Sequence, residues 1–297
     1  MTFCKRNLRS VWESYLIGLS IVLLALPLRL IAHGDLDEQI AIATKLIQKD
    51  PKNAELYLKR GELHRAHADW DAAMADYDRA VELDPMLVVV NLARGKALLA
   101  ANWPVSARVA LDRFLTQQTN HVDALVTRAR VFQKLGEHAA AAQDFTAAIN
   151  HSPEPQPEFF IERAESLAAQ PGDHLGETLR SLDEGIKKLG PLVTLQLYAI
   201  DLEIKQKHFD AALARLDLIA AQSPRKETWL AKRGEILQQA GRIIAAREAY
   251  QSALKAIESL PASRRQVPAM AELENRLRSV LKEQTLAADK ESKQIKK

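Results

Sequence analysis

The stretch AELYLKRGELHRAHADWDAAMADYDRAVELDP, from Ala54 to Pro85, decides the fold because its pattern returns 34 residues later from Val88 and again from Val122. In each window the eighth residue is small, the twentieth is alanine and the twenty-fourth is large and apolar. Small residues let two helices approach closely, a large residue fills the space between them, and proline ends the second helix. These positions are Gly61, Gly95 and Ala129, then Ala73, Ala107 and Ala141, then Tyr77, Leu111 and Phe145. The stretch therefore predicts a pair of antiparallel helices, repeated along the chain.

The period and the alternation of small and large residues resemble the tetratricopeptide repeat. This resemblance implies an all-α fold, a right-handed superhelical solenoid of antiparallel helix pairs, over roughly 230 of the 297 residues. The later windows are less even: QPGDH lengthens the fourth, Ile200 replaces the small residue of the fifth, and Gly234 and Tyr250 restore the pattern in the sixth. We expect six repeats, over residues 54–87, 88–121, 122–156, 157–192, 193–226 and 227–260.

Partial elements are expected at both ends of the repeats. Residues 35–53 resemble the second helix of an incomplete repeat. Residues 261–288 carry apolar side chains at helical spacing and a charged remaining face, which predicts a capping helix over the last pair. The apolar positions of this cap are Met270, Leu273, Leu277, Val280 and Leu281. The basic tail over residues 289–297 is expected to be a solvated end, with binding to anionic lipid or an acidic partner as the alternative.

The first 34 residues predict export. Lys5, Arg6 and Arg9 precede an uncharged run over residues 14–28, and Arg29 interrupts the apolar character that follows. A basic start, a short apolar run and small residues beyond it are typical of a signal peptide, with cleavage after Gly34 or after Ala32. The alternative is a retained membrane anchor. Both interpretations place the repeats outside the cytoplasm, in the periplasm or secreted in the first case and at the inner membrane in the second.

The composition of the chain argues against nucleic-acid binding, disulfides and catalysis. The chain has 41 basic and 38 acidic side chains, and residues 1–34 hold four of the former and one of the latter, so residues 35–297 carry 37 of each. A balanced domain offers no basic stripe for nucleic acid. The only cysteine, Cys4, precedes the apolar run, so the repeats contain no disulfide. Catalytic and phosphate-binding motifs are missing from the sequence, and packing is the simplest role for His64, so we expect no enzyme activity, cofactor or metal site.

An arginine recurs at the seventh place of five windows: Arg60, Arg94, Arg128, Arg163 and Arg233. In the first and third windows an aspartate, Asp76 or Asp144, lies on the second helix roughly opposite. We interpret these pairs as braces between the two helices. The alternative is a ladder of arginines that grips an acidic peptide. Because Arg94, Arg163 and Arg233 lack that aspartate, they are expected to be freer to bind.

The resemblance also implies that the first helices line a concave groove, in which residues four apart on one face contact a peptide. A positive centre at Lys96 and Arg130, flanked by Glu62 and Glu165, would suit a peptide with acidic residues at its middle; the other interpretation is a solvated surface. The expected groove residues are Leu58, Glu62, Arg65, Leu92, Lys96, Leu99, Val126, Arg130, Gln133, Ile161, Glu165 and Glu235.

Two functions follow from this sequence. The first is a non-catalytic scaffold or adaptor of the cell envelope that binds a protein or peptide on its concave face. The second is a dedicated accessory or regulatory subunit of one envelope enzyme or transporter. A subunit would be recovered in fixed ratio with its partner, whereas an adaptor would recover several partners in smaller amounts.

Overall fold

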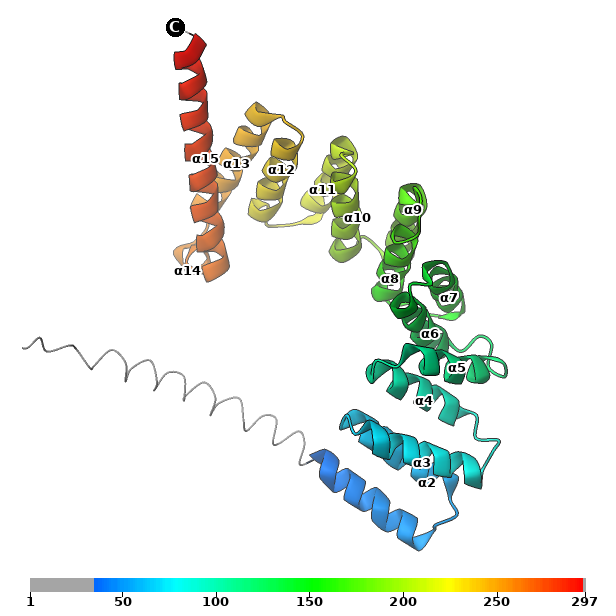
Figure 1. Cartoon of the computed structure of the whole chain (residues 1–297). Helices are drawn as coiled ribbons and strands as arrows, with labels where there is room; N and C mark the ends of the chain where they lie inside the picture. Colours follow the sequence, from blue (N-terminus) through cyan, green and yellow to red (C-terminus); the bar gives the residue numbers. More distant parts are fainter. Residues whose placement is uncertain (1–34, 296–297) are drawn as a thin grey trace, which may run out of the picture. The chain divides into compact units, whose positions relative to one another are not determined.

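The computed structural model describes residues 35–295 and their side chains as far as residue 286. All regular secondary structure in this range is helical (Figure 1). The chain divides after Pro153 into two compact units, which we describe separately.

The first unit contains one unpaired helix, over residues 35–49 (blue in Figure 1), and three helix pairs. Each first helix packs on the second helix of its own pair, and the second helices of the first two pairs also contact the first helix of the next pair. The pairs are α2 (Ala54–Ala66) with α3 (Trp70–Leu83), α4 (Val89–Ala100) with α5 (Pro104–Leu115), and α6 (Val122–Leu135) with α7 (His138–His151).

The second unit contains three more pairs and a terminal element. The pairs are α8 (Pro157–Ala168) with α9 (Leu175–Leu189), α10 (Val193–Lys205) with α11 (Phe209–Gln222), and α12 (Glu227–Gln239) with α13 (Ile243–Glu258). A short α14 (Ala262–Arg265) leads into α15 (Pro268–Ile295), which packs on α13.

The terminal helix differs from its expected bounds of 261–288. It begins later, at Pro268, because α14 and a turn come first, and proline suits the first position of a helix. It also continues to Ile295, so the backbone of most of the expected solvated tail is helical. No glycine or proline follows Pro268, so nothing in the sequence terminates this helix early.

The turn inside each pair has a common geometry. The fifteenth residue adopts a left-handed backbone conformation in five of the six windows, with φ between 62° and 75°. These residues are Ala68, Asn102, Gly136, Lys207 and Gly241. A left-handed residue ends the first helix and turns the chain so that the second helix packs back on it.

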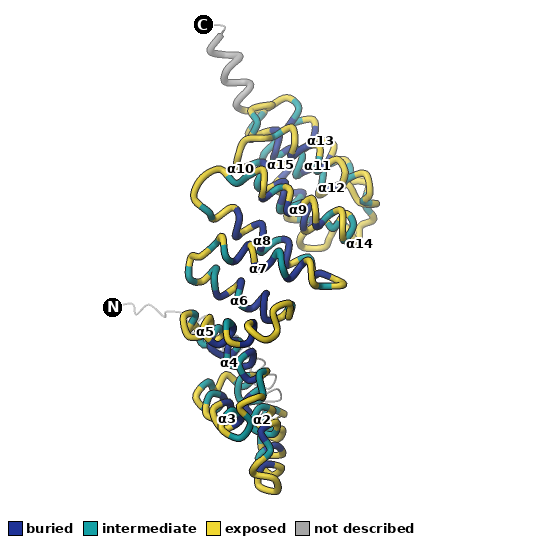
Figure 2. Tube along the Cα trace, turned by 90° about the vertical axis from the view of Figure 1, so that its right-hand side faces the viewer, coloured by how far each residue is buried: buried dark blue, intermediate teal, exposed yellow. Residues whose placement is uncertain are grey.

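Close packing between helices follows the small and large pattern. A Cβ atom added at Gly61 would lie 2.6 Å from Cε1 of Tyr77, and one added at Gly234 would lie 2.4 Å from Cδ1 of Tyr250. In α8 and α9 the arrangement is reversed: the large residue, Phe160, is on the first helix and the small one, Gly185, on the second. Figure 2 shows buried residues recurring along the helices of each unit.

Candidate peptide-binding face

Two of the recurring arginines bind the aspartate of their own pair. Arg60 donates from Nε and Nη2 to the two carboxylate oxygens of Asp76, at 2.8 and 2.6 Å. Arg128 donates in the same way to Asp144, at 2.7 and 2.9 Å. Both aspartates are buried, so each forked pair joins the first helix to the second and satisfies a carboxylate removed from water.

The arginines expected to be freer also have partners, and that expectation is wrong. Arg94 binds Asp78 and Arg233 binds Asp217, each on the second helix of the preceding pair, 16 residues earlier in the chain. Arg128 makes the same backward contact to Asp112, at 2.8 Å, in addition to its own aspartate. An aspartate at the twenty-fifth place of the first, second and fifth windows was the sequence signal for these contacts. The arginines therefore connect neighbouring pairs as well as the helices within one pair.

Windows four and five use other partners for the same purpose. Arg163 is buried and donates to the Ser181 hydroxyl at 2.7 Å and to Glu184 at 2.6 Å. The fifth window has Ala199 at the seventh place, but Arg215 occupies the place where Asp76 and Asp144 stand in theirs.

Arg215 forms an ion pair between the two helices of the fifth pair, but here the second helix carries the arginine and the first helix carries the carboxylate. It binds Asp183 at 2.6 Å and the buried Glu203 at 2.8 Å. Hydrogen bonding to Asp183, and then to Glu203, raises the pKa of Arg215 above its usual value. Through these two carboxylates Arg215 joins α11 to α9 and α10.

Two of the expected groove residues are buried in the first unit. Leu92 and Val126 are 6% and 4% exposed, so neither side chain is open to a ligand, and their assignment to the binding face is wrong. Each stands at the fifth place of its window, Leu92 on α4 and Val126 on α6, and these two first helices contact each other. Leu58, at the same place in the first window, and Leu99 are half-buried.

The charged groove residues of the first unit are bound to their neighbours. Glu62 accepts hydrogen bonds from Arg65, at 2.8 Å from Nη2, and from the Tyr77 hydroxyl, at 2.6 Å. Lys96 forms an ion pair with Asp123. Arg130 is exposed, and it and the half-buried Gln133 also interact with other residues of the protein. The expected positive centre is therefore partly neutralised by Asp123.

The second unit holds the remaining groove residues, Ile161, Glu165 and Glu235. Ile161 is half-buried and Glu165 exposed, on the same first helix. Partial burial, and then the nearby charge of Glu162, raise the pKa of Glu165. Burial, and then the charge of Glu165, raise the pKa of Tyr198 on α10 to about 12. Glu235 lies 3.1 Å from Arg276 of α15, so the terminal helix reaches this side of α12.

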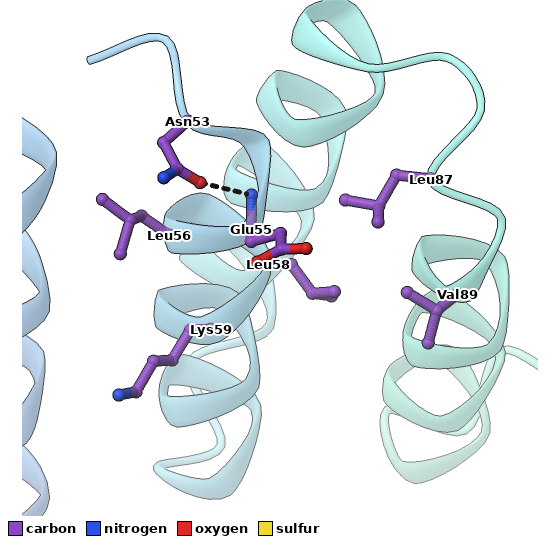
Figure 3. A pocket seen from close by; sticks show the side chains of 7 residues that line it. All are labelled: Asn53, Glu55, Leu56, Leu58, Lys59, Leu87 and Val89. Carbon is purple, nitrogen blue, oxygen red and sulfur yellow. Dashed lines mark hydrogen bonds between the residues drawn. The ribbon is translucent and has the colours of Figure 1, made fainter. Parts of the chain in front are cut away.

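An open pocket of about 410 Å³ lies between the starts of α2 and α4 (Figure 3). Leu58 lines it from α2, while Leu87 and Val89 come from the start of α4 and point toward α2. Glu55 and Lys59 add one charge of each sign. Leu58 was predicted from the sequence, whereas Leu87 and Val89 were not: Leu87 precedes α4, and Val89 is the first residue of that helix, outside the window positions assigned to the groove.

Two family models match the chain. One is described as a tetratricopeptide repeat and matches residues 24–85, and one is described as a tetratricopeptide repeat-like domain and matches residues 177–270. The chain belongs to the tetratricopeptide repeat (TPR) family.

Solved structures show the same fold. This TPR protein is 16% identical to a tetratricopeptide repeat protein from Parabacteroides merdae, with a TM-score of 0.51 and coverage of 83% of this chain and 94% of that one. It is also 16% identical to the C-terminal part of a TPR repeat-containing protein from Cytophaga hutchinsonii, with a TM-score of 0.61 and coverage of 76% and 95%. The expected all-α solenoid of antiparallel helix pairs is confirmed.

A curated relative shares a short segment. The Protein SGT1 homolog of Oryza sativa subsp. japonica is 32% identical over 83 residues, which is 27% of this TPR protein and 23% of the relative. The chain therefore matches less than a quarter of that protein's length, and the similarity does not extend to the rest of the relative.

Several sequence-based expectations lie outside the described residues. These concern Cys4, the apolar run over residues 14–28 and the cleavage positions after Ala32 and Gly34. Within residues 35–295, no helix is long and apolar enough to cross a membrane. The same part of the chain contains no cluster of three or more His, Cys, Asp or Glu side chains that could hold a metal ion. His64 lies 3.9 Å from both Asp69 and Asp76, beside the Arg60 pair.

Proposed function

We propose that this TPR protein is a non-catalytic scaffold that binds a protein or peptide partner on the exposed side of its first helices. The observation that carries this proposal is the succession of helix pairs, in which the second helices and the arginine pairs hold the fold together and leave part of each first helix accessible. TPR-type stacks present extended surfaces of this kind, and such surfaces suit extended or helical peptides.

The binding face is revised by the structure. Leu92 and Val126 are removed from it because they are buried. In the first unit the pocket formed by Leu58, Leu87 and Val89 supplies an apolar site for one side chain of the partner. Lys96 lies on α4 as well, but a ligand must compete with Asp123 for its charge. We therefore propose that apolar contact at the pocket contributes more to affinity than the charges do.

We further propose that the protein acts in the cell envelope. The support is the N-terminal sequence alone: basic residues, an apolar run and small residues before residue 35. N-terminal sequencing of the protein recovered from its native envelope tests this. A chain that begins at His33 or Asp35 indicates a removed leader, and a chain that retains Met1 in the membrane fraction indicates an anchor. Recovery of the intact chain from the cytoplasm would contradict export.

Affinity capture from the native envelope tests the binding function. Val89 is exposed at the pocket, so Val89→Asp is expected to reduce partner capture without loss of helix content. Lys96→Glu combined with Arg130→Glu is expected to have a smaller effect in the same direction. The control is Arg79→Glu combined with Arg113→Glu, which makes the same charge change at exposed positions of second helices. Capture that survives all three substitutions on the first helices removes this face from the proposal.

The same capture distinguishes the scaffold from the accessory subunit. A partner recovered in fixed ratio with the chain, and no other, favours the dedicated subunit. Several partners in smaller amounts favour the scaffold. Measured turnover that one substitution of a titratable residue abolishes would overturn both.

A further inference from the structure

The helix over residues 35–49 leaves one apolar face uncovered. Ile42 and Leu46 are 50% and 38% exposed, and Gln39 beside them is exposed as well. Counted back by 34 residues, these three stand where α3 carries Ala73, Asp76 and Ala80, all of which are buried. In α3 that face is covered by the first helix of the same pair. The helix over residues 35–49 is a second helix with no first helix among the described residues.

The opposite face of this helix is firmly held. Ala43 and Ile47 are buried, and Arg60 donates to the Thr44 hydroxyl at 3.1 Å. Asp37 lies 3.6 Å from His67 at the end of α2. The helix therefore packs on the first repeat as the second helices of later pairs pack on the next repeat, and its open face is displayed on a fixed support.

Charges on the open face are divided along the helix. Asp35 and Glu38 lie in its first half, and Lys45 and Lys49 in its second half, at spacings of three and four residues that place them on the side of Ile42 and Leu46. All four are exposed. The face thus carries its acidic side chains before Ile42 and its basic side chains after it, with Lys45 between Ile42 and Leu46 and Lys49 beyond Leu46.

We propose that this face binds the same face of a second copy of the chain, with the two helices antiparallel. In that arrangement Ile42 packs beside Leu46 of the partner subunit, and Glu38 lies beside Lys49 of the partner subunit, each contact occurring twice. A two-fold axis requires a surface that complements itself, and an acidic half opposite a basic half does so only when the helices run in opposite directions. First and second helices are also antiparallel within each repeat, so the partner's helix would lie where a first helix lies in the later pairs.

The interface is small, and the dimer is correspondingly weak. One helix face on each side falls at the low end of the area found in specific complexes, so we expect a dissociation constant on the order of micromolar. Association through this face is independent of the first-helix face proposed above for the partner protein, and either proposal can fail alone.

Sedimentation velocity of the full chain, purified from the envelope of the producing cell over a range of concentrations, tests the dimer. Ile42→Glu combined with Leu46→Glu is expected to raise the dissociation constant more than about tenfold, because four carboxylates replace the apolar centre. The matched control is Val105→Glu combined with Val109→Glu, an exposed apolar pair four residues apart on α5, which is expected to leave association unchanged.

A charge exchange tests the antiparallel direction. Glu38→Lys alone and Lys49→Glu alone are each expected to weaken the dimer about tenfold, because each places like charges together twice. The double variant, Glu38→Lys with Lys49→Glu, restores both contacts and is expected to return the dissociation constant to within about threefold of the original. A chain that stays monomeric at every concentration overturns the proposal. In that case the face around Ile42 is covered by residues before 35 or by a different protein. A dimer that is indifferent to these substitutions also overturns it.

Discussion

At the scale of single residues, Gly61 allows the closest approach of α2 and α3. Gly61→Ala is expected to destabilise the fold by about 1–3 kcal/mol, because the added Cβ atom would lie 2.6 Å from the buried ring of Tyr77. Gly176→Ala is the matched control on α9, where the nearest side-chain atom to the new Cβ is 3.5 Å away, on Arg180. This control is expected to be neutral or to stabilise by about 0.5–1 kcal/mol. Denaturant unfolding monitored by circular dichroism measures both, and equal effects at the two glycines would contradict the packing described here.

Arg128 stabilises the protein through two carboxylates at once. Arg128→Met is expected to cost about 1–3 kcal/mol, because Asp144 is buried and loses its forked partner while Asp112 loses its contact. Arg79→Met provides a control, since Arg79 pairs with Glu82 where both side chains are exposed, and little change is expected there. The measurement is again the free energy of unfolding. A variant at Arg128 that keeps its stability and loses partner capture would favour the ligand-gripping interpretation instead.

The sequence predicted a contact well where both residues lie in the same window. It predicted a contact poorly where the partner residue lies in a neighbouring repeat. The pairing of Arg60 with Asp76 followed from spacing within a single window. The partners of Arg94 and Arg233 were not predicted because each is an aspartate of the preceding window. Leu92 and Val126 were misplaced because a first helix touches neighbouring first helices, and no pattern within one window reports how deeply that contact buries a side chain.

At the scale of elements, the repeat period predicts accurately where each helix pair begins. The first helices begin at residues 54, 89, 122, 157, 193 and 227, at or next to the window starts. The bounds of the terminal helix were predicted less well, since residues 261–297 do not continue the 34-residue pattern and helix propensity alone indicates where the helix ends. The packing of Phe160 against Gly185 in the fourth pair was not predicted either. A large residue on one helix and a small residue on the other can exchange places without altering the repeat period.

The contact between α14 and α15 predicts sensitivity to acid. Hydrogen bonds from Arg265, and then from Arg278, lower the pKa of Glu274 from 4.5 to about 2. A carboxyl group with a lowered pKa stabilises the folded state above its ordinary pKa, and that contribution is lost as the pH falls from about 4.5 toward about 2. We expect α15 to loosen from α14 over that range, with faster amide hydrogen exchange in α15.

The control for this prediction is Glu274→Gln, which removes the titrating group. Its protection from exchange in α15 is expected to be lower at neutral pH and to change less between about pH 4.5 and 2. A variant whose α15 shows the same dependence on pH as the original would assign the acid sensitivity to other carboxylates.

At the scale of the whole molecule, the two units are expected to fold separately. The first has a core around Tyr77 and Val90, and the second has its own core around Leu216 and Ile257. Helix pairs in a solenoid depend mainly on their nearest neighbours, so residues 35–153 and residues 154–297, produced as separate chains, are each expected to melt cooperatively. Circular dichroism during heating checks this. An unfolded half would show that the division after Pro153 does not mark an independent unit.

The reversed packing of Phe160 against Gly185 also limits how this protein can exchange parts with its relatives. In most pairs here the first helix brings the small residue, so a second helix borrowed from such a pair would set its large side chain against Phe160. A recombination point in the loop between α8 and α9 would therefore yield a defective hybrid, whereas one placed between whole pairs would carry both members of the contact together. A hybrid that keeps the fourth pair whole is therefore expected to keep this packing.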